Sequence, residues 1–128
     1  MSTKTVHMDE LHFDHQLWAT KLNFYKDEIK IYQKRLEQIS QKNTAIEIKI
    51  KVEQFQNRFI IQLKELNDLL DEQKNHEKEL ALIAQENTVA SDHIRFNAHT
   101  EHEEEIVTFE KLFSELKVEF SKFCRQSL

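Results

Sequence analysis

The chain of 128 residues contains no glycine and no proline. Tight turns with a positive φ angle favour glycine, and sharp chain reversals often use proline, so a turn-rich all-β fold is almost excluded. The glycine-rich loops of dinucleotide-binding and Walker-type phosphate sites are excluded outright, because they need glycine. The two absences favour a helical fold and remove a large group of nucleotide-binding functions.

Cysteine pairs and long apolar runs are missing as well, and we expect no secretory leader. Cys124 is the only cysteine, so it has no partner for an internal disulfide. No run reaches the roughly 18 apolar residues that a membrane-spanning helix needs. Residues 1–7 lack the apolar centre of a secretory signal. We therefore expect a cytoplasmic protein with no membrane span.

Positive charge is in the minority, with 18 lysine and arginine residues against 23 aspartate and glutamate residues, and the net charge is -5. An acidic chain is a poor match for nucleic acid or for an anionic membrane surface, so we expect neither as a partner. The hydrophobic content of 39% is too high for a disordered chain. We expect residues 1–128 to form one domain, with residues 1–7 as a flexible N-terminal tail.

Apolar residues recur at alternating spacings of three and four in three segments, which is the period of amphipathic helices. The segments run from Leu11 to Ile39, from Ala45 to Ile83 and from His99 to Phe123. Short polar breaks separate them, so consecutive helices should be antiparallel neighbours. The sequence therefore predicts an all-α fold, an antiparallel three-helix bundle with coiled-coil-like packing. The predicted helices span about residues 8–40, 44–86 and 92–126.

Residues at the breaks and beside the stripes refine this prediction. Asn43 or Thr44 is expected to cap the second helix, and Ser91 or Asp92 the third. A flanking apolar column on the first helix widens its stripe, so that this helix is expected to contact two neighbours. The column consists of Leu17, Phe24 and Ile31.

The seven histidines are not spread evenly along the chain. They lie near the start of the first helix, the end of the second and the start of the third, which share one end of an antiparallel bundle. They are His7, His12, His15, His76, His93, His99 and His102. Four of them fall on the inward stripes, where an imidazole must find a hydrogen-bond partner or a metal.

The register between the helices decides which histidines converge. A second connection centred near residue 89 places His76 opposite His102. A first connection centred near residue 42 places His15 opposite Leu69, whereas a connection centred near residue 44 places His15 level with Gln73. The sequence leaves both registers open.

Two interpretations of the histidine cluster also stay open. In the first, which is the commoner situation, the histidines form a polar cluster that is hydrogen-bonded to neighbouring side chains and water. In the second, they bind a divalent transition metal such as zinc or iron, since facing helices of a bundle often carry such sites. The candidate ligands are His15, His76, His99 and His102, with Glu72, Glu79, Glu103 and His12 as possible additional ligands.

Catalytic constellations are otherwise missing from the sequence. Cys124 lies at the far end of the bundle from the histidines, so a Cys–His nucleophile is not supported. The Glu-x-x-His pairs of ferritin-like di-iron proteins do not occur. We expect no catalytic residues and no organic cofactor. Gln62, an isolated amide at a stripe position, is a candidate for fixing the register or for lying near a homodimer axis.

Three stretches, His12–Trp18, Phe55–Gln62 and Phe109–Phe113, resemble those of small uncharacterised helical proteins from Bacteroidetes-type bacteria. The resemblance extends over most of the chain. It implies a bacterial cytosolic origin and brings no activity with it.

The sequence as a whole favours a non-enzymatic helical bundle that serves as a protein-interaction or self-association module. The expected partner is a second copy or another helical protein, because the apolar stripes are wide and rich in aromatic residues. The alternative is a metal-binding bundle with a histidine-rich site at one end. A third possibility is a pH-responsive bundle, whose clustered histidines loosen that end when they become charged near about pH 6.

Overall fold

The computed structural model describes the backbone of residues 4–86 and 89–127, and the side chains of residues 9–82, 85 and 98–127. Three long helices account for almost all of the described backbone: α1 (Lys4–Lys42), α2 (Ile46–Glu86) and α3 (Val89–Gln126). No strand occurs in the described residues. The predicted all-α fold with three helices is confirmed.

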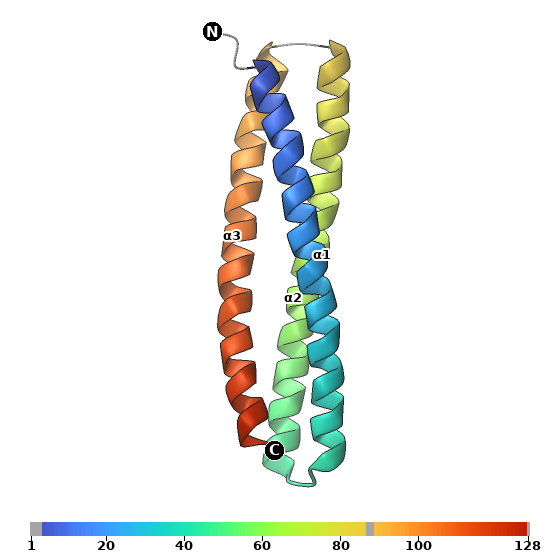
Figure 1. Ribbon diagram of the computed structural model, residues 1–128, viewed down its shortest axis with the longest axis vertical. Helices are drawn as coiled ribbons and strands as arrows, with labels where there is room; N and C mark the ends of the chain where they lie inside the picture. The colour runs from blue at the N-terminus through green and yellow to red at the C-terminus, as the bar shows by residue number, and fades with distance from the viewer. Residues whose placement is uncertain (1–3, 87–88, 128) are drawn as a thin grey trace.

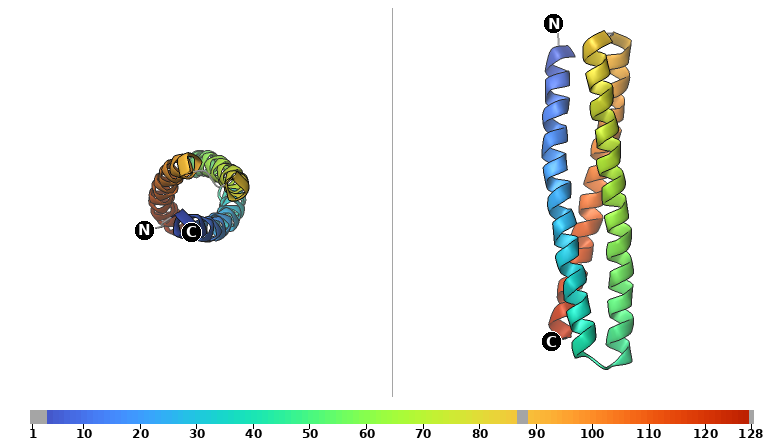
Figure 2. Two further views of the ribbon diagram at one scale, coloured as in Figure 1. Left: turned by 90° about the horizontal axis from the view of Figure 1, so that it is seen from above. Right: turned by 90° about the vertical axis from the view of Figure 1, so that its right-hand side faces the viewer.

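The helices form an elongated bundle in which α2 runs antiparallel to both α1 and α3 (Figure 1). Seen from above, the three rods surround a common long axis (Figure 2). The start of α1, the end of α2 and the start of α3 therefore meet at one end of the molecule (Figure 1). This is the end at which the sequence concentrates its histidines.

The helix ends differ from the predicted boundaries in four places, namely the starts of all three helices and the end of α1. α1 already begins at Lys4, so residues 4–7 of the predicted tail are helical; none of them is a glycine or proline that would stop a helix. The backbone N–H of Lys49 donates to the carbonyl of Ala45, which makes Ala45 the N-cap of α2 in place of Asn43 or Thr44. Asn43 instead caps the end of α1, because its side-chain amide donates to the carbonyl of Ile39 at 2.8 Å.

The predicted caps of the third helix are also wrong. α3 begins at Val89, so Ser91 and Asp92 lie inside its first turn. Residues 87 and 88 lie outside the described residues. Helix boundaries are the least certain part of a prediction from sequence, because favourable caps compete with the helix's tendency to extend through residues that do not break it.

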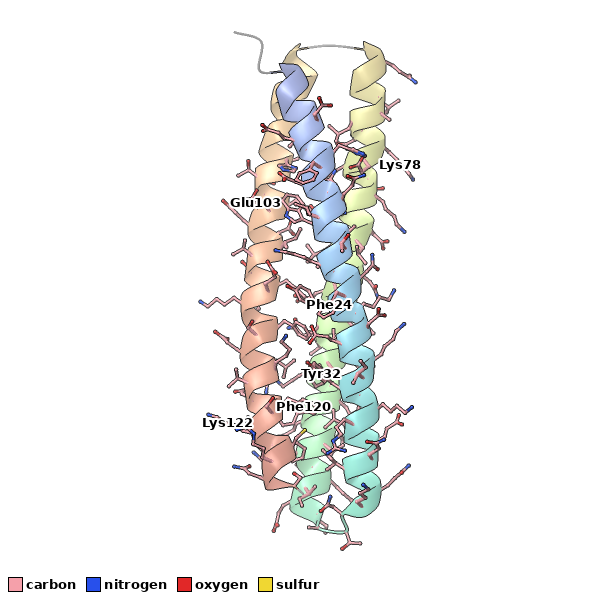
Figure 3. All side chains as sticks on the ribbon, viewed as in Figure 1. Phe24, Tyr32, Lys78, Glu103, Phe120 and Lys122 are labelled. Carbon is pink, nitrogen blue, oxygen red and sulfur yellow. The ribbon has the colours of Figure 1, made fainter. Side chains whose placement is uncertain are left out.

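One continuous core fills most of the bundle. Its best-buried members come from all three helices and include Leu22, Ile29, Phe59, Leu66 and Phe113. Aromatic rings pack closely at the end away from the histidines, where Phe59 and Phe120 meet edge to face with centroids 5.3 Å apart. The described phenylalanines of α3 are buried core residues, as their helical spacing predicts: Phe109, Phe113, Phe120 and Phe123. Figure 3 shows Phe120 turned toward the other helices and Lys122 turned outward.

The flanking column of α1 contradicts one expectation. Leu17, Phe24 and Ile31 do not widen the buried stripe, since 48%, 62% and 65% of their surfaces are exposed. Both neighbours of α1 pack against the stripe that contains Leu22 and Ile29, and the column lies on the opposite side of the helix. This leaves an outward row of large apolar side chains on α1.

None of the described helices contains an apolar stretch long enough to cross a membrane. Gln62 is half-buried, and its amide oxygen has no hydrogen-bond partner among the described residues.

Candidate metal centre

Four histidine side chains meet between the three helices at the shared end of the bundle. His15, His99 and His102 are buried, and His102 has no exposed surface at all. His76 is largely covered, with 16% of its side chain exposed. The ring centroids of neighbouring pairs lie 5.2 to 6.4 Å apart. The structure thus brings together all four histidines that the sequence places on inward stripes.

The register that the structure adopts explains this convergence. The side-chain amide of Gln73 donates to the backbone carbonyl of His15 at 2.7 Å, so these two residues are level with each other across α1 and α2. This is the register of a connection centred near residue 44. The rings of His76 and His102 face each other across α2 and α3 with centroids 5.2 Å apart, as expected for the second connection.

Two of these histidines are joined in a chain of polar contacts that crosses the bundle. Nε2 of His99 lies 3.2 Å from a carboxylate oxygen of Asp14. Nδ1 of His99 lies 3.3 Å from Nε2 of His15. Nδ1 of His15 lies 2.7 Å from a carboxylate oxygen of Glu77. Each imidazole therefore has a carboxylate on one side and the other imidazole on the other.

This arrangement fixes the tautomers of both rings. An ionised carboxylate only accepts hydrogen bonds, so His99 carries its proton on Nε2 and His15 carries its proton on Nδ1. The two remaining nitrogens then present lone pairs to each other across 3.3 Å. A carboxylate that holds the far nitrogen of a histidine is the usual support of a metal-ligating imidazole. With metal–nitrogen bonds of about 2.0–2.1 Å, two ligands of a tetrahedral Zn²⁺ ion are about 3.3–3.4 Å apart.

A third imidazole lies near this pair, although the ligand atoms of His15, His76 and His99 are not among the described groups of three that lie within 4.8 Å of one another. His15, His76 and His99 line a small cavity of about 10 Å³ together with Leu11, Glu79, Leu80 and Ala98. Nδ1 of His76 is buried and has no hydrogen-bond partner among the described residues. Nε2 of His76 lies 4.0 Å from a carboxylate oxygen of Glu72. The cavity has about the volume that a single water-sized ligand occupies.

His102 lies beside this cavity and faces a different carboxylate. Its Nδ1 is 3.3 Å from a carboxylate oxygen of Glu72, yet neither ring nitrogen makes a well-formed hydrogen bond with a described residue. The ligand atoms of Glu72, His102 and Glu105 lie within 4.8 Å of one another, and so do those of Asp14, His99 and Glu103.

Burial favours the neutral form of His15, His99 and His102. Loss of hydration lowers the pKa of His102 to about 4, with a further lowering by the charge of neighbouring His76. The same loss of hydration lowers the pKa of His15 and the pKa of His99, against the opposing effects of Glu77 and Asp14. Neutral imidazole is the form that binds metals.

The indole ring of Trp18 packs against two of the histidines. The ring of Trp18 stacks on His99 with centroids 4.7 Å apart and lies 5.5 Å from the ring of His102. Trp18 therefore covers the two buried imidazoles of α3 from the side of the main core. A hydrophobic wall of this kind restricts solvent access to a metal site.

The other residues predicted as ligands have different positions. Exposed His12 lies 3.0 Å from a carboxylate oxygen of Glu77, outside the cluster. Glu79 lines the cavity, Glu72 lies between His76 and His102, and Glu103 is grouped with Asp14 and His99. The side chains of His7 and His93 lie outside the described residues.

The prediction from sequence missed several partners of the histidines: Asp14, Glu77, Glu105 and Trp18. Asp14 and Glu105 lie one and three residues from inward histidines, and Glu77 follows His76 directly. Carboxylates that border an inward histidine in the sequence are a signal that could have found them, because such residues flank the inward stripe.

Comparison of the chain with protein-family models, with curated proteins and with solved structures finds no match in any of the three.

Proposed function

We propose that this protein binds a divalent transition-metal ion of the Zn²⁺ type through His15, His76 and His99. The observation that carries the proposal is the approach of His15 Nε2 and His99 Nδ1 to 3.3 Å while a carboxylate faces the other nitrogen of each ring. His76 lines the same cavity as this pair, and a turn of its ring toward them would complete a three-imidazole set, which is a common ligand set for zinc. The sequence alone favours an interaction module and leaves a metal-binding bundle as the alternative, and this geometry supports the alternative.

A purely hydrogen-bonded cluster accounts less well for the same geometry. The contacts from Asp14 to Glu77 include three possible hydrogen bonds, which need three protons, but two neutral imidazoles supply only two. A third proton is disfavoured near neutral pH, because burial lowers the pKa of both His15 and His99. A cation between the two lone pairs removes their repulsion without an added proton.

The size of the cavity favours binding over catalysis. A space of about 10 Å³ can hold an ion or a water molecule but no organic substrate. We accordingly keep the expectation that the protein is not an enzyme, and we infer a role in holding or sensing a metal ion. The cytoplasmic location inferred from the sequence stays a prediction.

Metal analysis of purified, untagged protein, followed by zinc titration, tests this proposal. We expect one Zn²⁺ per chain and a rise in melting temperature, since a ligand at 100 times its dissociation constant adds about 2.7 kcal/mol to stability. His99→Ala should abolish both effects. Asn75→Ala is the control, because it removes an exposed polar side chain from the same end of the bundle. Absence of any zinc-dependent gain in wild type, or equal binding by His99→Ala, would refute the proposal.

We also propose that the chain self-associates through the outward apolar row of α1. Phe13, Leu17, Phe24 and Ile31 are 48–65% exposed and follow each other at spacings of four and seven residues. This is the spacing of a seam between two helices, so a second copy of α1 is the partner that fits it.

Light scattering after size-exclusion chromatography tests the second proposal. We expect wild type to dimerise as its concentration rises and Phe24→Glu to stay monomeric. The matched control is Leu112→Glu, which places the same charge on an exposed leucine of α3. A wild type that stays monomeric at the highest concentration would contradict the proposal.

A further inference from the structure

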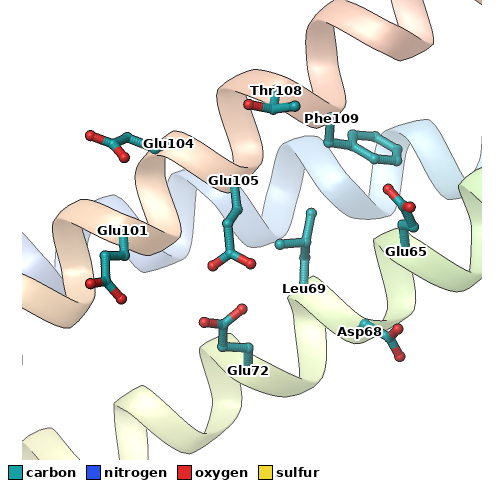
Figure 4. A pocket seen from close by; sticks show the side chains of 9 residues that line it. All are labelled: Glu65, Asp68, Leu69, Glu72, Glu101, Glu104, Glu105, Thr108 and Phe109. Atoms are coloured by element: carbon teal, nitrogen blue, oxygen red, sulfur yellow. The ribbon is translucent and has the colours of Figure 1, made fainter.

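An acidic groove runs between α2 and α3 next to the histidine cluster. It has a volume of about 850 Å³, and all the ionisable side chains that line it are acidic. Figure 4 shows the lining side chains: Glu65, Asp68, Leu69, Glu72, Glu101, Glu104, Glu105, Thr108 and Phe109. Acidic side chains concentrated in a groove raise the local concentration of cations.

At the bottom of this groove the carboxyl groups of Glu72 and Glu105 point toward each other from opposite helices (Figure 4). Their ligand atoms lie within 4.8 Å of each other, and Nδ1 of His102 lies 3.3 Å from the Glu72 carboxylate. His102 is fully buried, and neither of its ring nitrogens has a hydrogen-bond partner among the described residues. An imidazole without a partner thus faces a pair of carboxyl groups that are open to the groove.

We propose that Glu72, Glu105 and His102 form a second cation site, distinct from the three-histidine site, which binds a divalent ion such as Mn²⁺ from the acidic groove. The local sequence supplies the geometry: His102 and Glu105 are three residues apart on one face of α3, and Glu72 faces them from α2. The ligand atoms of the three residues already lie within 4.8 Å of one another.

The chemistry of this ligand set differs from that of the first site. Two carboxylates and one imidazole suit harder ions such as Mn²⁺, whereas a set of imidazoles suits Zn²⁺. Every ionisable side chain that lines the groove is acidic, so negative charge is in excess there; burial and the nearby charge of Glu72 accordingly raise the pKa of Glu105. A bound cation compensates the negative charge of the two facing carboxyl groups.

Binding of Mn²⁺ to the zinc-saturated full chain, followed through the electron paramagnetic resonance signal of free Mn²⁺, tests the proposal. We expect one Mn²⁺ per chain and binding that is weaker by about tenfold or more in Glu105→Gln, the range seen when a ligand environment is damaged. Glu104→Gln is the matched control, because it removes the same charge from the groove wall and should change the affinity by less than about threefold. Glu72→Gln is a second ligand variant, and circular dichroism checks that each variant is folded.

Three outcomes would decide against the site. Equal losses in Glu105→Gln and Glu104→Gln would indicate diffuse attraction by the groove and overturn the proposal. So would the absence of stoichiometric Mn²⁺ binding in wild type, or full Mn²⁺ binding in both ligand variants. The variant His15→Ala, without zinc, separates the two metal proposals: retained Mn²⁺ binding supports the second site whatever happens at the first.

Discussion

Nδ1 of His99 and Nε2 of His15 lie 3.3 Å apart inside the bundle, and a carboxylate faces the opposite nitrogen of each ring. The helices alone do not require this arrangement, because an apolar pair at the same stripe positions would pack without buried polar groups. The carboxylates select the tautomers that turn both lone pairs to one point. The pair therefore has the features of a prepared ligand site, and its supporting residues can be tested separately from its ligands.

Asp14→Asn should weaken zinc binding by about 10- to 100-fold while leaving the fold intact. The amide can still accept a hydrogen bond from His99 Nε2, but it no longer supplies the negative charge that makes the imidazole a better donor to the metal. Competition with a chromophoric chelator measures the affinity. Asp9→Asn is the control, because this substitution removes the same charge from an exposed position on the same helix. Equal affinities of the two variants would show that Asp14 has no positioning role.

Trp18 should report metal binding directly. It is the only tryptophan of the chain, and its ring stacks on His99 with centroids 4.7 Å apart. We expect Cu²⁺ or Co²⁺ to quench its fluorescence at one equivalent, because open-shell ions quench an adjacent indole, whereas Zn²⁺ with its filled d shell should quench far less. In His99→Ala the stoichiometric quenching should disappear. Quenching that persists there would place the bound ion elsewhere.

The metal-free protein should lose stability as the pH falls from about 6.5 to 4. The pKa of His102 is lowered from 6.5 to about 4, mainly by burial. Between these values the unfolded chain binds a proton at this residue and the folded protein does not, so the free energy of unfolding rises with pH. The full contribution is present above pH 6.5 and amounts to about 3 kcal/mol, at about 1.4 kcal/mol per pKa unit. His15 and His99 act in the same direction, because burial lowers the pKa of each.

Urea unfolding at a series of pH values measures this dependence. Glu105 acts in the opposite direction, because its pKa is raised in the folded protein, so the measurement should be repeated in Glu105→Gln. In that variant the slope between pH 4 and 6.5 should be steeper. A free energy of unfolding that stays flat over this range would contradict the assignment of neutral, buried histidines.

The sequence predicts the bundle well because the spacing of three and four between apolar residues is repeated many times along the chain. Each of Leu22, Ile29 and Leu36 shows the same inward face of α1, so the period survives a local error. The site depends on less redundant information. A shift of a few residues in the centre of the first connection decides whether His15 lies level with Gln73 or with Leu69. The helix caps that would define this centre differ from the predicted ones. The error over Leu17 and Phe24 has a similar origin, since periodicity marks apolar columns without saying which ones a neighbour covers.

His102→Leu should stabilise the metal-free protein while it weakens Mn²⁺ binding. His102 is fully buried, and neither ring nitrogen has a hydrogen-bond partner among the described residues. A buried polar group without a partner costs about 1–3 kcal/mol, whereas leucine of similar size suits the surrounding core. We therefore expect the urea midpoint at pH 7 to rise and the loss of stability below pH 6.5 to become smaller. His12→Leu, at an exposed position, should change neither quantity by more than about 0.5 kcal/mol. A protein destabilised by His102→Leu without metal would show that the imidazole is hydrogen-bonded in solution and would contradict this prediction.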